Sequence, residues 1–257
     1  MRIVVKVGTS TLAHPNGLLN IRRVEELCKV LSDLKNAGDD IILVSSGAIG
    51  MGVGNLHLNS SPRDVASKQA AAAVGQCELM YTYDKLFSEY NHTVAQLLIT
   101  GSDLECKDRY TNFVNTMNKL LEFSTLPIVN ENDTVATEEI KVGDNDTLSA
   151  LVAVSMGADL LILLSDIDGL FTADPHKDRN ATLISVVSEI NDDIRALAGD
   201  KGTQLGTGGM KTKISAAEIC TEKGCDMIIA NGSDPKILYD IIDGKSVGTR
   251  FIKKQVK

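Results

Sequence analysis

The residues best suited to chemistry lie in one connection, residues 129–153. It carries two carboxamides and two carboxylates that could bind a charged ligand: Asn130, Asp133, Asn145 and Asp146. The apolar run Leu126 to Val129 predicts a buried strand before them, and the apolar pattern from Leu148 to Met156 predicts a helix after them. Asn and Asp also cap helices and form turns. However, this connection holds more of them than one helix start can use, so we expect the centre of the site here.

Lysines near two other predicted element ends would supply positive charge. Lys6 lies near the end of the predicted strand Arg2 to Val7, where a buried lysine must face a carboxylate or an anionic ligand. Lys211 and Lys213 open a predicted helix, where positive charge opposes the helix dipole unless an anion lies nearby. Both positions therefore favour an anionic ligand.

Glycine-rich turns follow predicted strands and could contact that anion through backbone N–H groups. They are KVGTS (6–10), SSGAIG (45–50) and GTGGMKTK (206–213). Because glycine has no Cβ, such turns allow close approach of a phosphate. The last of them could equally be a plain flexible connection. Lysines, glycine turns and carboxylates at one sheet edge suit phosphoryl transfer, which depends mainly on positive charge and positioning.

Other nucleotide-binding motifs are absent. The GKS at 244–246 lacks the glycine that a P-loop requires five residues earlier, where the chain has Tyr239. No GxGxxG follows a predicted strand, and the protein-kinase patterns are missing as well.

Composition is typical of an ordinary globular protein. The 257 residues are 43% hydrophobic, and the net charge of -8 argues against a nucleic-acid surface. The five cysteines form no CxxC pair and the four histidines are scattered, so neither a zinc site nor a disulfide framework is predicted. No apolar run approaches the roughly 20 residues of a membrane helix. The N-terminus predicts a strand instead of a signal peptide, and we expect a reducing cytoplasm.

The elements that must position these residues alternate along the chain. Predicted strands lie at 2–7, 41–44, 93–99, 126–129, 160–164, 183–187 and 227–230, and predicted helices at 20–37, 61–90, 110–123, 148–156, 210–223 and 235–243. A small hairpin is predicted at 135–142. Such alternation implies a mostly parallel sheet with helices on both faces, in one domain over 1–257.

Six stretches taken in order carry a family resemblance: KVGTS, SSGAIG, SKQAAAAVGQ, NENDTVATEEIKVGDNDTLSAL, SDIDGLFTADP and GTGGMKTK. Together they resemble the glutamate 5-kinases of the amino acid kinase family. The resemblance implies an αβα sandwich and transfer of the ATP γ-phosphoryl group to the side-chain carboxylate of L-glutamate, the first step of proline biosynthesis. It also implies Mg²⁺ with ATP as co-substrate, feedback inhibition by proline, hand-over to glutamyl phosphate reductase and a homo-oligomer.

The resemblance also implies roles for individual residues. Lys6 and Lys213 would contact the transferring phosphoryl group, with Asp146 between them as their organiser. The glutamate site would comprise Ser46, Asp133 and Asn145. The ATP site would comprise Lys6, Ser165, Asp166, Thr207, Gly208, Gly209, Met210, Lys211, Thr212 and Lys213. A glutamate side chain is already ionised at neutral pH, so no general base is needed.

The sequence departs from the family pattern in places. Many bacterial members continue into a C-terminal PUA-type domain, which we expect this chain to lack. Phe171 stands where relatives often have Tyr, and Ser165 where some have Thr; both changes should preserve nucleotide binding.

Other members of the family fit less well. Acetylglutamate and aspartate kinases follow the first lysine with a glycine pair that KVGTS lacks, and NEND and GDND disfavour a uridylate kinase. A non-catalytic nucleotide-sensing module would lose a charged residue, whereas Lys6, Asp146 and Lys213 are all present.

Overall fold

The computed structural model describes residues 1–14, 18–136, 145–175, 177–198 and 209–254. Its centre is one eight-stranded sheet with the strand order β3-β4-β2-β1-β5-β7-β8-β6. Neighbouring strands pair in parallel except β7 and β8, which are antiparallel. The strands are β1 (Arg2–Val7), β2 (Asp40–Ser45), β3 (Val94–Ile99), β4 (Leu126–Glu131), β5 (Leu160–Ser165), β6 (Val186–Val187), β7 (Asp226–Asn231) and β8 (Thr249–Phe251).

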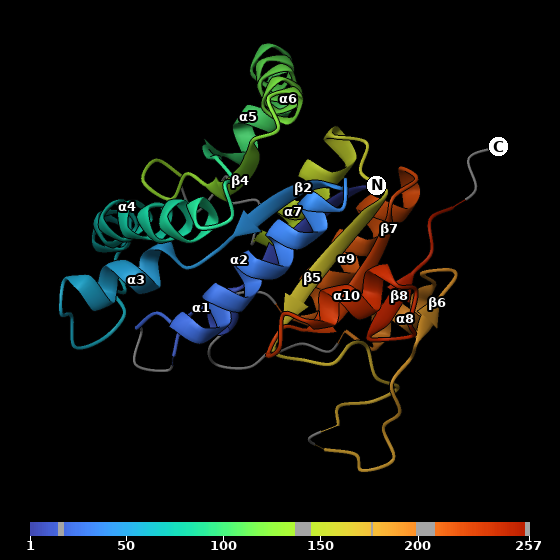
Figure 1. The fold of residues 1–257 in the computed structure, drawn as a ribbon. Helices are drawn as coiled ribbons and strands as arrows, with labels where there is room; N and C mark the ends of the chain where they lie inside the picture. The colour runs from blue at the N-terminus through green and yellow to red at the C-terminus, as the bar shows by residue number, and fades with distance from the viewer. Residues whose placement is uncertain (15–17, 137–144, 176, 199–208, 255–257) are drawn as a thin grey trace.

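Helices cover both faces of this sheet (Figure 1). The helices α2, α4 and α10 pack on one face, and α6, α7 and α9 pack on the other. The predicted αβα sandwich with a mostly parallel sheet is therefore confirmed. Within the described ranges, no helix has both the length and the apolar character needed to span a membrane. The helices are α1 (Thr9–Leu12), α2 (Ile21–Asn36), α3 (Ala48–Asn55), α4 (Val65–Ser88), α5 (Gly101–Glu105), α6 (Lys107–Glu122), α7 (Asn145–Ser155), α8 (Asp192–Ala196), α9 (Met210–Glu222) and α10 (Ile237–Ile242).

Strand β1 shows how the sheet assigns side chains to the two layers. Successive side chains of a strand point to opposite faces. Ile3, Val5 and Val7 accordingly belong to the core under α2, whereas Val4 belongs to the core under α7 and α9. Lys6 follows Val4 in this alternation. Its ammonium group is therefore directed to the layer that contains the starts of α7 and α9.

The helix α3 was not predicted, because the segment SSGAIGMGVG reads as a glycine-rich turn. The structure forms only the start of this segment as a loop and continues as a helix that packs on α4. A Cβ at Gly52 would lie 1.8 Å from the carbonyl oxygen of Ala71, and a Cβ at Gly75 would lie 1.8 Å from that of Ala48. Glycine is therefore required at both positions for the two helices to lie this close.

The other predictions need smaller corrections. The helix predicted at 110–123 begins at Lys107 and follows the short α5, and the strand predicted at 183–187 is reduced to Val186–Val187. The long Ala-rich helix begins at Val65, with Asp64 as its N-cap. Strand β8 and the short helices α1 and α8 were not predicted. Most of the hairpin predicted at 135–142 lies outside the described residues.

Candidate active site

The candidate site lies at the edge where the parallel strands end. Val7 of β1 pairs with Ser45 of β2 and with Leu164 of β5, so the loops after these three strands begin side by side. Ligands collect at this edge in open α/β sheets. The segments that were predicted to carry chemistry therefore converge here.

Asp146 is the centre of an ion-pair cluster. Its Oδ1 lies 2.6 Å from Nζ of Lys6, and its Oδ2 lies 3.0 Å from Nζ of Lys213. The hydroxyl of Thr212 donates a hydrogen bond to the same Oδ2 at 3.0 Å. Asp146 is fully buried and Lys213 is 6% exposed. The two lysines that the resemblance assigns to the phosphoryl group and the aspartate that it assigns as their organiser thus form one largely buried cluster.

Local structure explains why these charges meet. Asp146 lies in the first turn of α7, where a carboxylate interacts favourably with the helix dipole. Lys213 lies in the first turns of α9, where a cation is unfavourable by itself. The nearby carboxylate of Asp146 offsets that cost. It equally satisfies Lys6, which would otherwise be a buried unpaired charge at the end of a central strand.

The charge state of Asp146 follows from two opposing effects. Burial raises the pKa of its carboxyl group, but the ammonium groups of Lys6 and Lys213 together lower it further, so that the pKa lies well below the ordinary value. Asp146 is therefore ionised at neutral pH. It cannot accept a proton as a general base there, and the formal charges of Lys6, Asp146 and Lys213 sum to +1.

A chain of amide hydrogen bonds lies beside this cluster. Nδ2 of Asn145 donates to Oγ of Ser46 at 2.7 Å and to Oδ1 of Asn130 at 2.9 Å. Nδ2 of Asn130 donates in turn to Oε1 of Gln76 at 2.9 Å. The structure thus brings Ser46, Asn130 and Asn145 together as expected. Gln76 was not predicted to lie here; the signal in the sequence was a polar residue next to a glycine in an Ala-rich helix.

Asp133 lies in the turn that follows β4 and is half-buried. It lies three residues along the chain from Asn130, whose side chain accepts a hydrogen bond from Asn145. The structure therefore places Asp133 just beyond the carboxyl end of β4.

The proposed nucleotide residues begin at the end of β5. The hydroxyl of Ser165 donates to Oδ1 of Asp166 at 3.1 Å, and the Ser165 carbonyl accepts from Gly232 N at 2.7 Å. Further along the loop, Asn231 Nδ2 donates to Asp168 at 2.7 Å. These contacts fix the loop after β5 against the loop after β7.

The remaining predicted nucleotide residues surround the start of α9. Gly209 is its N-cap, and Met210, Lys211 and Thr212 form its first turn. Thr207 and Gly208 lie outside the described residues. Residues two positions apart in an α-helix differ by about 200° around its axis. Lys211 and Lys213 therefore project in nearly opposite directions.

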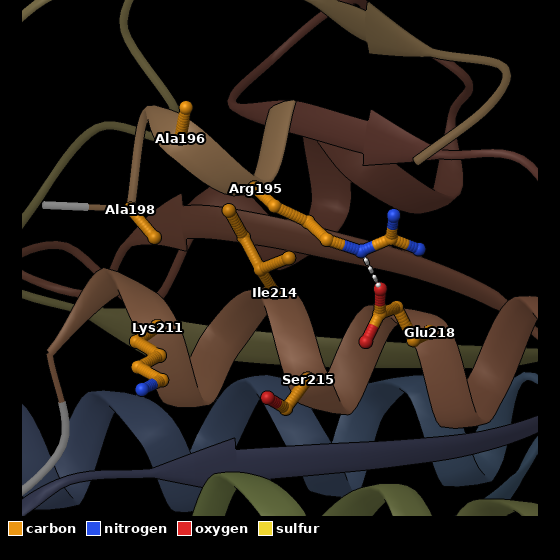
Figure 2. Close-up of a pocket in the computed structure, with 7 residues that line it drawn as sticks. All are labelled: Arg195, Ala196, Ala198, Lys211, Ile214, Ser215 and Glu218. Atoms are coloured by element: carbon orange, nitrogen blue, oxygen red, sulfur yellow. Dashed lines mark hydrogen bonds and ion pairs between the residues drawn. The ribbon is translucent and has the colours of Figure 1, made fainter. Parts of the chain in front are cut away.

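Lys211 lines a separate pocket on the outer side of α9 (Figure 2). This pocket has a volume of about 450 Å³ and is formed by α9, by α8 and by Ala198, which follows α8. The guanidinium of Arg195 lies 2.6 Å from the carboxylate of Glu218 at its border. The structure therefore does not bring Lys211 into the cluster around Asp146.

Comparisons with known proteins identify the family. The model of the amino acid kinase family matches residues 1–231. A glutamate 5-kinase of Clostridium acetobutylicum is 54% identical over 98% of this chain and 95% of its own length. A longer glutamate 5-kinase of Caldanaerobacter subterraneus subsp. tengcongensis is 52% identical over 98% of this chain and 68% of its own length.

A solved structure shares the fold at much lower identity. Isopentenyl phosphate kinase of T. acidophilum has a TM-score of 0.65 and 15% identity, over 98% of this chain and 100% of that one. At this identity the likeness concerns the fold alone. The sequence comparisons are more specific, and from them the chain belongs to the amino acid kinase family and, within it, to the group of glutamate 5-kinases.

Proposed function

We propose that this protein transfers the γ-phosphoryl group of MgATP to the side-chain carboxylate of L-glutamate, forming L-glutamyl 5-phosphate and ADP. Identity of 54% over nearly the full length of a glutamate 5-kinase supports both substrates. The observation that carries the chemistry is the buried cluster of Lys6, Asp146 and Lys213. The product would enter proline biosynthesis.

The cluster suits the charge that develops during the transfer. A carboxylate oxygen of glutamate attacks the γ-phosphorus, and the bond to the oxygen that bridges the β- and γ-phosphates breaks, so ADP leaves with that electron pair. Charge is spread over the phosphoryl oxygens in the transition state. Lys6 and Lys213 would contact these oxygens, while Asp146 keeps both ammonium groups in position. Because the attacking carboxylate is already ionised, no residue has to remove a proton.

The amino acid substrate would lie between the loops after β2 and β4 and the start of α7. The carboxylate of Asp133 would pair with the ammonium group of glutamate. Ser46 and Asn145, which contact each other at 2.7 Å, would bind the remaining polar groups of the substrate.

The nucleotide would lie over β5 and the start of α9. Ser165, Asp166 and the segment from Thr207 to Lys213, with Gly208, Gly209, Met210, Lys211 and Thr212, are the residues we assign to it. The first turn of a helix presents free backbone N–H groups, which favour phosphate. The cluster at Asp146 would receive the γ-phosphoryl end.

Mg²⁺ would arrive as part of MgATP. Among the described residues, no group of three or more His, Cys, Asp or Glu side chains could hold a metal ion. Mg²⁺ commonly keeps its waters and binds mainly through substrate phosphates. When bound, the ion would neutralise phosphate charge.

Several further properties belong to this proposal. We expect a cytoplasmic homo-oligomer that is inhibited by proline, which shares the amino-acid backbone groups of the substrate. The acyl phosphate product is reactive, so hand-over to glutamyl phosphate reductase would protect it from water.

Trapping with hydroxylamine tests the proposed reaction. The purified protein is incubated with MgATP, hydroxylamine and L-glutamate, or with aspartate, N-acetylglutamate or UMP, while ADP release is followed in parallel. Glutamate-dependent hydroxamate and ADP are expected. Turnover with only another acceptor would overturn the substrate, and no turnover with any acceptor would favour a nucleotide-sensing module.

A further inference from the structure

Ser45 is the last residue of β2 and is fully buried directly before the loop that carries Ser46. Its side chain points to the layer of α4, because Leu43, two residues earlier on the strand, packs in the core under α2 and α4. Oγ of Ser45 lies 2.8 Å from the hydroxyl oxygen of Tyr83, a fully buried residue of α4. The same Oγ lies 3.0 Å from the carbonyl oxygen of Ser46.

The direction of these two hydrogen bonds follows from the atoms involved. The carbonyl oxygen of Ser46 has no hydrogen and can only accept. Among the described residues, the hydroxyl of Tyr83 has only Ser45 as a hydrogen-bond partner, so Tyr83 must donate to Ser45. Ser45 then donates its own hydrogen to the Ser46 carbonyl. The reverse direction would leave the buried Tyr83 hydrogen without an acceptor, which costs free energy.

The bond from Ser45 orients the peptide group between Ser46 and Gly47. This peptide is trans, so its carbonyl and its N–H point in opposite directions. The carbonyl is directed to the layer of α4, and the N–H of Gly47 therefore points to the other layer. Oγ of Ser46 accepts from Asn145 at the start of α7 in that layer. Within the described ranges, no group accepts a hydrogen bond from Gly47 N–H, which is therefore available to a ligand.

Gly47 makes this orientation easy to lose. Its φ is 111°, and glycine adopts positive and negative φ about equally well because it has no Cβ. The preceding peptide can therefore rotate at little steric cost. Ser46 is only half-buried, so its carbonyl could turn to water once Ser45 no longer held it. The hydroxyl of Ser45 supplies the interaction that favours one orientation.

We propose that Ser45 is a positioning residue that holds the N–H of Gly47 towards the acceptor substrate, where it donates to a carboxylate oxygen. The inference rests on the proposed function, because it concerns the amino acid side of the same site. Ser45 touches no substrate atom itself and acts through the peptide between Ser46 and Gly47. Loss of its hydroxyl should therefore weaken the binding of the acceptor and leave ATP binding unchanged.

The test compares two variants that break the same buried hydrogen bond. Ser45→Ala and Tyr83→Phe both remove the bond between the two hydroxyls, so both should lower the urea midpoint of unfolding. Only Ser45→Ala also removes the bond to the Ser46 carbonyl. We expect the KM for L-glutamate to rise about tenfold in Ser45→Ala and less than about twofold in Tyr83→Phe. The KM for ATP should stay within about twofold of the wild type in both variants.

A double variant separates positioning from stability. Ser45→Ala leaves the hydroxyl of Tyr83 buried without a partner, and adding Tyr83→Phe removes that hydroxyl. The double variant should recover part of the lost urea midpoint, while its KM for L-glutamate stays about tenfold above the wild type. Ser45→Thr keeps the hydroxyl and should keep the KM near the wild-type value. If Ser45→Ala does not fold, the double variant, which has no unpaired hydroxyl here, takes its place in the comparison.

Other outcomes would overturn the inference. An equal rise of the KM for L-glutamate in Ser45→Ala and Tyr83→Phe would show that the two hydroxyls only support the fold. An unchanged KM in Ser45→Ala would show that the peptide keeps its orientation without Ser45. A KM that recovers together with the urea midpoint in the double variant would attribute the effect to stability. Failure of the proposed function would look different, because the wild type would then release no ADP with L-glutamate.

Discussion

Lys6 and Lys213 contact different oxygens of one carboxylate, at 2.6 Å and 3.0 Å from Oδ1 and Oδ2 of Asp146. Two ammonium groups this close repel each other, and a single carboxylate balances only one of them. The formal charges of these three side chains therefore sum to +1, which favours a further anion beside them. A transferring phosphoryl group would supply that anion, and it would do so most strongly as charge builds on its oxygens.

Replacement of Lys213 by alanine should lower turnover strongly. The variant loses one of the two cations at the reacting group but keeps the loop after β5. We expect kcat to fall by about a hundredfold or more, with a change of only a few-fold in the KM for ATP. Steady-state kinetics with MgATP and L-glutamate measure both. Lys223→Ala, which changes an exposed lysine at the end of the same helix, is the matched control. Unchanged turnover in Lys213→Ala would remove this lysine from the site.

Replacement of Asp146 by asparagine should alter the pH dependence of stability. Because the folded-state pKa of Asp146 is lowered from 3.8 to about 2, the folded state is stabilised at pH values above the unfolded pKa. That contribution is lost as the pH falls from about 4 towards 2, and it amounts to about 2 kcal/mol. Between pH 4 and pH 2, the free energy of unfolding of the variant should therefore fall by less than that of the wild type.

Urea unfolding at several pH values between 5 and 2 checks this expectation. Asp84→Asn, at an exposed position of α4, serves as the control and should follow the wild-type curve. If the free energy of unfolding depends on pH in the same way in the wild type and in Asp146→Asn, the role of the ion pairs is contradicted. At neutral pH, Asp146→Asn should also be less stable by about 3 kcal/mol, because two lysines lose their buried partner.

Replacement of Asp133 by asparagine should weaken the binding of glutamate selectively. The substitution keeps the shape of the side chain but removes the charge that we assign to the ammonium group of the substrate. The KM for L-glutamate should rise about tenfold or more, and the KM for ATP should stay within about twofold. An equal rise of the KM for L-glutamate and of the KM for ATP would contradict this role of Asp133.

Much of the ion-pair cluster was predictable from sequence because its residues lie at the ends of regular elements. The alternation of Arg2 to Val7 predicts β1, and a lysine there requires a counter-charge. Asp146 and Lys213 open helices whose apolar patterns are clear. Physical reasoning thus indicated an anion site, and the family resemblance assigned the roles of individual residues.

The support beneath the site was not predictable in the same way. Helix α3 contains three glycines, and each costs about 1 kcal/mol relative to alanine in a helix. The helix forms there because Gly52 allows contact with α4, which is a tertiary effect that local pattern does not contain. Gln76 acquires its partner Asn130 only through this packing.

Strand β8, in the other half of the sheet, also depends on tertiary contacts that the local sequence pattern does not contain. One of its residues, Thr249, leads to a last prediction. Thr249 is fully buried; its hydroxyl accepts from Leu170 N at 2.8 Å and donates to the Ile184 carbonyl at 2.6 Å. The residue therefore holds the loop that begins at Asp166. Thr249→Val keeps the shape but removes the partner of the buried Leu170 N–H and of the half-buried Ile184 carbonyl, which should cost about 2 kcal/mol of stability.

The same variant should raise the KM for ATP about fivefold and leave that for glutamate unchanged, because only the loop after β5 loses its anchor. Thr249→Ser keeps the hydroxyl and should restore most of the affinity for ATP. Urea unfolding and steady-state kinetics with each substrate varied in turn measure these effects. If stability falls while both KM values remain at the wild-type level, the contacts of Asp168 with Asn231 and of Ser165 with Gly232 suffice to hold the loop.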